Sequence, residues 1–150
     1  MSATKFGTCN LIFNMDAPTL TQSEQQQLIE VATQVMANAY APYSQFRVGA
    51  ALLTATGEIV AGCNVENASY GLSMCAERNA IANAIIRLGE DTMEVRAIAI
   101  VNSQNVPCSP CGACRQVIWE FGQNAQVIFL GKQGWQTLSI KQLLPEGFSF

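Results

Sequence analysis

Apolar residues recur at helical spacing in three separate parts of the chain. The first part is introduced by Thr21-Gln-Ser-Glu24, a pattern typical of a capped helix start, and Ala41-Pro42 ends it. The second and third parts each stop at a glycine, Gly89 and Gly122, which favours a helix end. We therefore predict helices over 21–39, 75–88 and 112–121, with one more helical turn over 140–144 before Pro145.

Shorter apolar runs between these helices have the length and the flanking turn residues of β-strands. Thr56-Gly57 separates two such runs and predicts a hairpin, while the nearly unbroken apolar run over 95–101 is typical of a strand covered on both faces. Strands are expected over 48–54, 59–65, 95–101, 126–130 and 135–139. Because helices and strands alternate after the hairpin, we predict an α/β fold: a three-layer α/β/α sandwich around a mixed, roughly five-stranded sheet.

Length and composition assign this fold to one domain. The 150 residues suffice for a single core, and residues 1–20 carry little pattern, so we expect an N-terminal extension over 1–20 and one domain over 21–150. Only 13% of the residues are charged, which points to surface buried between subunits. The net charge is −3 and the eight Lys and Arg residues form no cluster, so no polynucleotide partner is expected.

The cysteine content bears on the compartment and on the chemistry. The first residues lack the long apolar run of a secretory leader, and no stretch reaches the length of a membrane span. We therefore expect a cytoplasmic protein with no membrane partner, in which the six cysteines are reduced thiols. Metal binding or catalysis then has to explain their clustering.

Two short motifs, Cys75-Ala-Glu77 and Pro110-Cys-Gly-Ala-Cys114, stand where a loop enters a predicted helix. A thiolate is the metal-binding form of cysteine, and a helix N-terminus favours it. Cys111 and Cys114 share one helical turn, and an α/β/α fold brings the two helix starts to the same sheet edge. The three cysteines of the motifs are therefore candidate zinc ligands, and three ligands leave the open fourth position that is typical of a catalytic site.

Cys108 provides an alternative, because it stands in Cys-x-x-Cys spacing with Cys111 and could close a structural four-cysteine site. That reading leaves Glu77 without a function beyond complementing the helix dipole, although a buried carboxylate there is costly unless it serves an ion or a substrate. Since the chain contains no histidine, Glu77 is the candidate general acid and base. Arg78 and Arg115 follow the motifs directly and are candidates to donate hydrogen bonds to the cysteine sulfurs.

The CAER and PCGACRQ segments resemble the zinc-dependent cytidine deaminase family, whose signature is Cys- or His-x-Glu followed by Pro-Cys-x-x-Cys. Two further segments, APYSQFRVGAAL at 41–52 and GCNVENASYG at 62–71, are similar to the small homotetrameric members of that family. The ending LLPEGF at 143–148 also fits. The resemblance extends from about Ser23 to Phe148 and leaves out the first twenty residues.

This resemblance implies hydrolytic deamination of cytidine and deoxycytidine to uridine and deoxyuridine, a reaction of pyrimidine salvage, with one Zn²⁺ per chain. Cys75, Cys111 and Cys114 would hold the zinc, and Glu77 would be the proton shuttle. The other matching positions are substrate-binding in the family: Asn64 and Glu66 for the ribose hydroxyls, Phe46 near the base, and Tyr70 and Phe148 at a neighbouring subunit's site.

Three other functions compete with this one. A deaminase of another cytosine-bearing compound, such as blasticidin S, would have no use for a ribose contact at Glu66. A polynucleotide deaminase conflicts with the acidic net charge of −3. A non-catalytic module stabilised by zinc would have its metal enclosed by four protein ligands.

Overall fold

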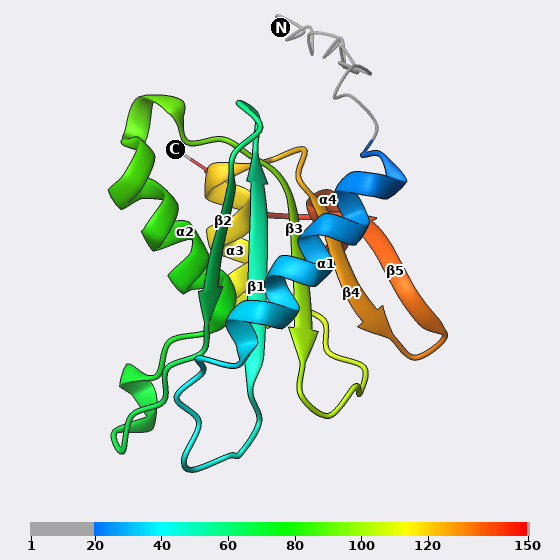
Figure 1. Ribbon diagram of the computed structural model, residues 1–150. Helices are drawn as coiled ribbons and strands as arrows, with labels where there is room; N and C mark the ends of the chain where they lie inside the picture. The colour runs from blue at the N-terminus through cyan, green and yellow to red at the C-terminus, as the bar shows by residue number, and fades with distance from the viewer. Residues whose placement is uncertain (1–19, 150) are drawn as a thin grey trace, which may run out of the picture.

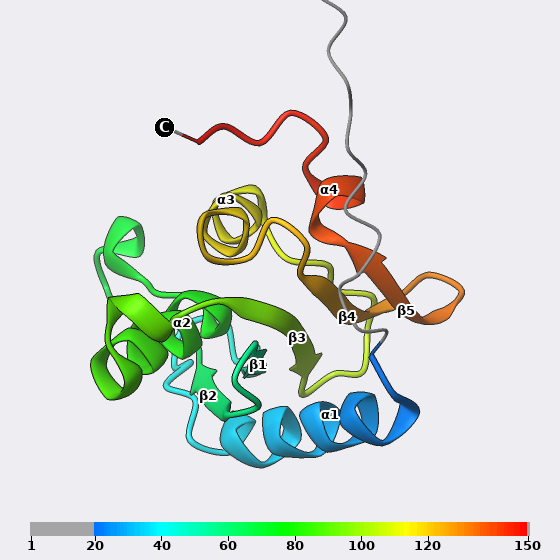
Figure 2. The ribbon, with the colours of Figure 1, turned by 90° about the horizontal axis from the view of Figure 1, so that it is seen from above.

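The computed structural model describes residues 20–149, and these form a five-stranded mixed sheet between two helical layers (Figure 1). Viewed along the strands, α1 lies on one face of the sheet, and α2 and α3 lie on the other (Figure 2). The three-layer sandwich and its mixed sheet are confirmed. The helices are α1 (Gln22–Met36), α2 (Ala76–Leu88), α3 (Gly112–Phe121) and α4 (Ile140–Leu143), and the strands are β1 (Val48–Thr54), β2 (Ile59–Cys63), β3 (Val95–Asn102), β4 (Gln126–Gly131) and β5 (Gly134–Ser139).

The strand order is β2-β1-β3-β4-β5, with β3 and β4 parallel and every other neighbouring pair antiparallel. The parallel pair requires a crossover, and α3 provides it. Since β3 is central, its residues are buried on both faces apart from a half-buried Arg96, as its unbroken apolar run predicts. The C-terminal end of β3 and the N-terminal ends of α2 and α3 therefore meet at one end of the sheet (Figure 1).

Side chains that alternate along the strands build a separate core on each face of the sheet. Small alanines of β1 and β3 face α1, whose buried residues Leu28 and Ala32 pack on them. Larger residues such as Ile98 and Ile100 face α2, α3 and α4. This difference in size lets α1 lie close to the sheet, while the opposite face carries the bulk of the core.

Several predicted boundaries shift by a few residues. Helix α1 ends at Met36 rather than near residue 39, although its capping box at Thr21 and Glu24 is confirmed. Strand β2 ends at Cys63 rather than 65, because the Asn64 side chain binds the backbone at Phe46 and Val48 and redirects the chain. A short 3₁₀ turn, Tyr70–Leu72, lies within the predicted loop.

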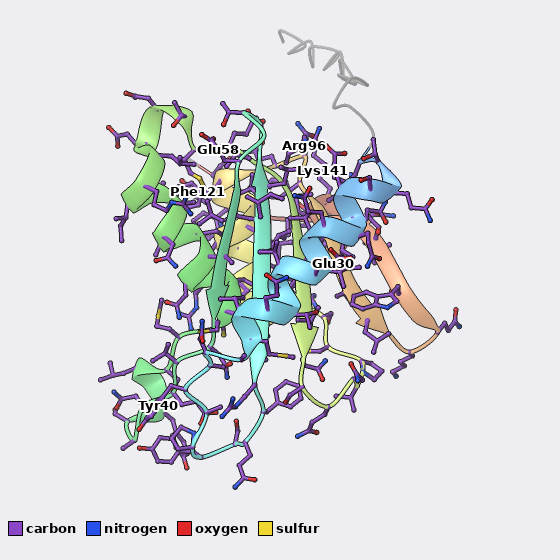
Figure 3. The ribbon with its side chains drawn as sticks, viewed as in Figure 1. Glu30, Tyr40, Glu58, Arg96, Phe121 and Lys141 are labelled. Carbon is purple, nitrogen blue, oxygen red and sulfur yellow. The ribbon has the colours of Figure 1, made fainter. Side chains whose placement is uncertain are left out.

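The predicted extension lies outside the described residues except for Leu20, which is buried against the α1-side core. At the start of α1, Glu24 also forms an ion pair with Arg96 of β3. Arg96 is labelled in Figure 3. The Thr21 backbone and side chain and the Arg96 guanidinium hold the pKa of Glu24 down to about 2. Among the described residues, no helix has the length and apolar character needed to cross a bilayer.

Helix α2 approaches β2 very closely at Gly62. A Cβ atom at Gly62 would lie 2.3 Å from the Ala80 amide nitrogen and 2.7 Å from the Ala76 carbonyl oxygen, both in the α2 backbone. Two α2 side chains add hydrogen bonds to the same strand: Asn79 donates to the Cys63 carbonyl at 2.8 Å, and Asn83 donates to the Ala61 carbonyl at 3.0 Å. Gly62 thus sets the position of the N-terminal half of α2.

We predict that Gly62→Ala forces α2 away from β2, because the added Cβ atom would overlap the α2 backbone at these distances. The expected loss is about 3 kcal/mol of unfolding free energy, the upper end of the usual range for overpacking. Urea denaturation measures it. Gly71→Ala is the matched control, since a Cβ there meets nothing within 4 Å. Equal stability of the two variants would contradict the close approach.

Candidate active site

The first turns of α2 and α3 bring three cysteines together. Cys75 is the N-cap residue of α2, Cys111 is the N-cap residue of α3, and Cys114 lies in the first turn of α3. Their sulfur atoms all lie within 4.8 Å of one another. Cys114 is fully buried, Cys75 is half-buried and Cys111 is exposed, so the cluster extends from the core to the surface.

This cluster suits a zinc ion. Zinc–sulfur bonds of about 2.3 Å in a tetrahedron place sulfurs a little under 4 Å apart, a spacing that the cluster can adopt with little movement. Thiolates are ligands that zinc favours, and both helix N-termini supply partial positive charge beside them. The Cys114 backbone amide donates to the Cys111 sulfur at 3.5 Å, which ties the N-cap sulfur to the first turn of α3.

The two arginines after the motifs have different partners. Arg78 donates to the Cys75 sulfur at 3.7 Å and to the Ser73 carbonyl at 3.1 Å. Hydrogen bonds from the Cys114 thiol and from Arg78 lower the pKa of Cys75 to about 5, whereas the hydrogen bond to Cys75 raises the pKa of Cys114. Arg115 instead donates to the Pro110 and Leu143 carbonyls and to the Ser109 hydroxyl, so its recorded side-chain bonds reach no sulfur.

A cavity of about 530 Å³ opens beside the cluster, and Cys75, Glu77 and Cys111 line it. Glu77 is only 5% exposed, and burial raises the pKa of its carboxyl group. A buried carboxyl whose pKa is raised and that lies beside a candidate metal site is a candidate for moving protons. The cavity has the size of a small-molecule site.

Asn64 and Glu66, which follow the end of β2, line the same cavity. Both side chains also hold the chain that precedes β1. The Asn64 amide accepts from the Val48 nitrogen at 2.8 Å and donates to the Phe46 carbonyl at 2.9 Å. The Glu66 carboxylate accepts from the backbone nitrogen of Tyr43 at 2.9 Å and from the backbone nitrogen and hydroxyl of Ser44. The Ser44 hydroxyl bond is the main reason that the pKa of Glu66 is lowered.

The predicted aromatic residues are less closely grouped. Tyr70 lines the cavity, is 77% exposed, and its ring lies 6.2 Å from that of Tyr43 in an edge-to-face arrangement. Phe46 is half-buried and contributes its backbone carbonyl rather than its ring to the described contacts. Phe148 is 63% exposed, and its backbone carbonyl accepts a hydrogen bond from the Gln116 side chain of α3 at 3.0 Å.

The sequence reasoning missed several cavity-lining residues, among them the polar side chains of Tyr43, Ser44, Ser73 and Ser109. Nothing in a single sequence distinguishes them from ordinary loop residues. Cys108 also lines the cavity, but it does not belong to the three-sulfur group, and burial raises the pKa of its thiol. A closed site of four cysteines is therefore not formed by the described residues.

Comparison with known proteins agrees with this geometry. The family model described as the cytidine and deoxycytidylate deaminase zinc-binding region matches residues 22–130, which include all three clustered cysteines and Glu77. A cytidine deaminase of Halalkalibacterium halodurans is 45% identical over 128 residues, which cover 84% of this chain and 95% of the relative. A blasticidin-S deaminase of Bacillus cereus is 30% identical over 124 residues, which cover 79% of this chain and 88% of the relative.

The fold has close counterparts among solved structures. The crystal structure of a cytidine deaminase from Burkholderia pseudomallei superposes with a TM-score of 0.74 at 47% identity, covering 82% of this chain and 98% of that chain. A cytidine deaminase from Mycobacterium tuberculosis gives a TM-score of 0.73 at 38% identity, covering 83% of this chain and 97% of that chain. Since the family model spans more than half of the residues and these relatives match most of the chain, the protein belongs to the zinc-dependent cytidine deaminase family.

Proposed function

We propose that this protein hydrolyses cytidine and deoxycytidine to uridine and deoxyuridine with release of ammonia. The observation that carries the proposal is the placement of the buried Glu77 carboxyl in one cavity with the three-sulfur cluster. The relatives at 45% and 47% identity that are named cytidine deaminase support this substrate class.

The residues of the cavity divide the chemistry between them. A zinc ion held by Cys75, Cys111 and Cys114 would supply a water molecule activated for attack on C4 of the base. Glu77 would take the proton of that water, deliver it to N3 of the ring, and then assist the departure of ammonia. Arg78 would offset the negative charge that three thiolates place on the metal, since it donates to the Cys75 sulfur.

Two polar residues of the cavity suit a ribose. Asn64 and Glu66 lie there with their polar atoms oriented by the loop before β1, and a sugar diol needs such an acceptor and donor pair. None of the cavity-lining residues within 20–149 is a lysine or an arginine, so a phosphate group would meet the Glu66 carboxylate without a compensating cation from this part of the chain. We therefore infer a free nucleoside as substrate, rather than a nucleotide or a polynucleotide.

We further propose that the chain works in the cytoplasm, in pyrimidine salvage, as a homotetramer in which Tyr70 and Phe148 approach a neighbouring subunit's site. The five described cysteines form no disulfide, which suits a reducing compartment. Tyr70 and Phe148 are both more than 60% exposed, and Phe148 lies outside the cavity of its own chain. We place Phe46 near the base, because the Asn64 side chain holds the loop that contains Phe46.

The substrate assignment is tested with three compounds at equal concentration: cytidine, deoxycytidylate and blasticidin S. We expect rapid ammonia release from cytidine and, because the cavity lacks a cation and contains a ribose-facing carboxylate, far slower release from the other two. Faster turnover of blasticidin S than of cytidine would favour the rival substrate. No ammonia from any cytosine compound would favour a non-catalytic zinc module.

Replacing Glu77 with glutamine removes the proton shuttle but preserves the side-chain volume. We expect kcat to fall by about 10³-fold or more, since general acid and base catalysis contributes factors of this order and Glu77 serves several steps. Zinc content should stay at one ion per chain. Glu30→Gln, on the exposed side of α1, is the matched control and should keep full activity. Activity of Glu77→Gln within tenfold of the control would contradict the assigned role.

The number of sulfur ligands is tested by comparing Cys108→Ala with Cys111→Ala. Cys108 lies outside the three-sulfur group, so its variant should purify with the same zinc content as the unaltered protein. Cys111→Ala removes one of three ligands and should lose most of the zinc. Metal analysis of both variants distinguishes the two cases. Loss of zinc from Cys108→Ala would support the closed structural site.

A further inference from the structure

One residue of α3, Arg115, hydrogen-bonds three consecutive residues that end on a zinc ligand. Its side-chain Nε donates to the Pro110 carbonyl at 2.8 Å, and one terminal nitrogen donates to the Ser109 hydroxyl at 3.3 Å. Its backbone nitrogen donates to the Cys111 carbonyl at 2.9 Å, which is the first hydrogen bond of α3 and does not depend on the side chain at this position. The path from Ser109 to Cys111 is therefore held from a single position one helical turn away.

Packing holds this path only at Pro110, which is fully buried, and its hydrogen bonds come almost entirely from Arg115. Residues 105–111 form no helix or strand, and within residues 20–149 the hydrogen bonds recorded for Ser109 and Pro110 all come from Arg115. The nearest other backbone tie is the bond from the Cys108 nitrogen to the Leu130 carbonyl at 2.8 Å. Cys111 itself is exposed, so packing alone does not fix its sulfur.

The second terminal nitrogen of Arg115 connects this path to a rigid anchor. It donates to the Leu143 carbonyl, at the end of α4, at 3.1 Å. Helix α4 is fixed in the core by Ile140, which is fully buried and whose nitrogen donates to the Ala125 carbonyl at 2.9 Å. A planar guanidinium can donate to the Ser109, Pro110 and Leu143 oxygens at once, whereas a lysine carries all of its donors on a single nitrogen atom.

We propose that Arg115 is a positioning residue of the metal site: it fixes the Ser109–Cys111 segment against α4, and through that segment it sets how long the protein retains its zinc. Arg115 acts on the path of the chain that leads to the ligand, unlike Arg78, which donates to a ligand sulfur directly. The inference rests on the proposed function only in taking zinc to be the ion held by the three cysteines.

The experiment measures the rate at which zinc passes from the purified holoenzyme to an excess of a chromophoric chelator under native conditions. We expect Arg115→Ala to release zinc on the order of ten to a hundred times faster than the unaltered protein, the usual effect of losing a residue that supports a metal ligand. Gln116→Ala is the matched control: Gln116 is the next residue of α3 and donates to the Phe148 carbonyl instead. Its release rate should be unchanged.

Two further measurements separate positioning from a general loss of stability. The global unfolding rate of Arg115→Ala, followed by circular dichroism, should rise by a much smaller factor than the zinc release rate. In the cobalt(II)-substituted variant, the d–d absorption bands should shift or weaken, because they depend on the geometry of the ligand sulfurs. Release of zinc at the unaltered rate, or a release rate that rises only as much as the unfolding rate, would overturn the proposal.

If Arg115→Ala does not fold, Ser109→Ala gives the test, because it removes one of the Arg115 acceptors and leaves the core intact. Release about fivefold faster is expected from the loss of one hydrogen bond, and an unchanged rate in this variant would contradict the proposal. The outcomes remain distinct from those of the proposed function. Failure of that function is seen as an unaltered protein without zinc or without deamination, whereas failure of this inference leaves both intact.

Discussion

The site depends on two helix N-termini that meet at one end of a twisted sheet. Each helix contributes an N-cap cysteine, and partial positive charge from the unpaired amides of both helices favours the thiolate form there. The parallel β3–β4 pair, with α3 as its crossover, places α3 beside α2 on the same face. Gly62 then lets α2 lie against β2 at backbone contact distance, which determines where Cys75 and Glu77 are held. The fold therefore sets the positions of the residues that carry the chemistry.

Negative charge is concentrated in a small volume at this point, and its compensation explains the surrounding residues. Besides burial, the nearby Cys75 sulfur raises the pKa of the Glu77 carboxyl, and, besides the hydrogen bond to Cys75, Glu77 in turn contributes to the raised pKa of Cys114. The helix N-termini, the Arg78 guanidinium and a doubly charged metal ion offset this charge. Burial with a balanced charge is the condition under which a carboxyl group can exchange a proton near neutral pH.

Much of this arrangement could be read from the sequence, because it is carried by local patterns. The capping box at Thr21, the glycine stops and the unbroken β3 run each report on a few neighbouring residues, and all of them predicted elements that the structure contains. The motif spacing placed three cysteines and Glu77 at two helix starts, and the structure brings them together. The assigned substrate roles of Phe46, Tyr70 and Phe148 came only from the resemblance and stay predictions.

The sequence could not reveal hydrogen bonds to backbone groups, because these bonds depend on how the chain folds. Arg115 follows a ligand directly, which suggested a bond to sulfur, but its side chain reaches the Pro110 and Leu143 carbonyls. Carbonyl groups carry no signal in a sequence, since every residue has one. The same holds for Glu66 and Asn64, whose bonds to the backbone between Tyr43 and Val48 depend on how the loop folds.

In the proposed site, three sulfurs hold one zinc ion and leave a fourth position for water. X-ray absorption spectroscopy at the zinc edge of the purified protein tests it most directly. Three sulfur neighbours at about 2.3 Å and one oxygen at about 2.0 Å are predicted. Four sulfur neighbours, or an active protein without zinc, would contradict it.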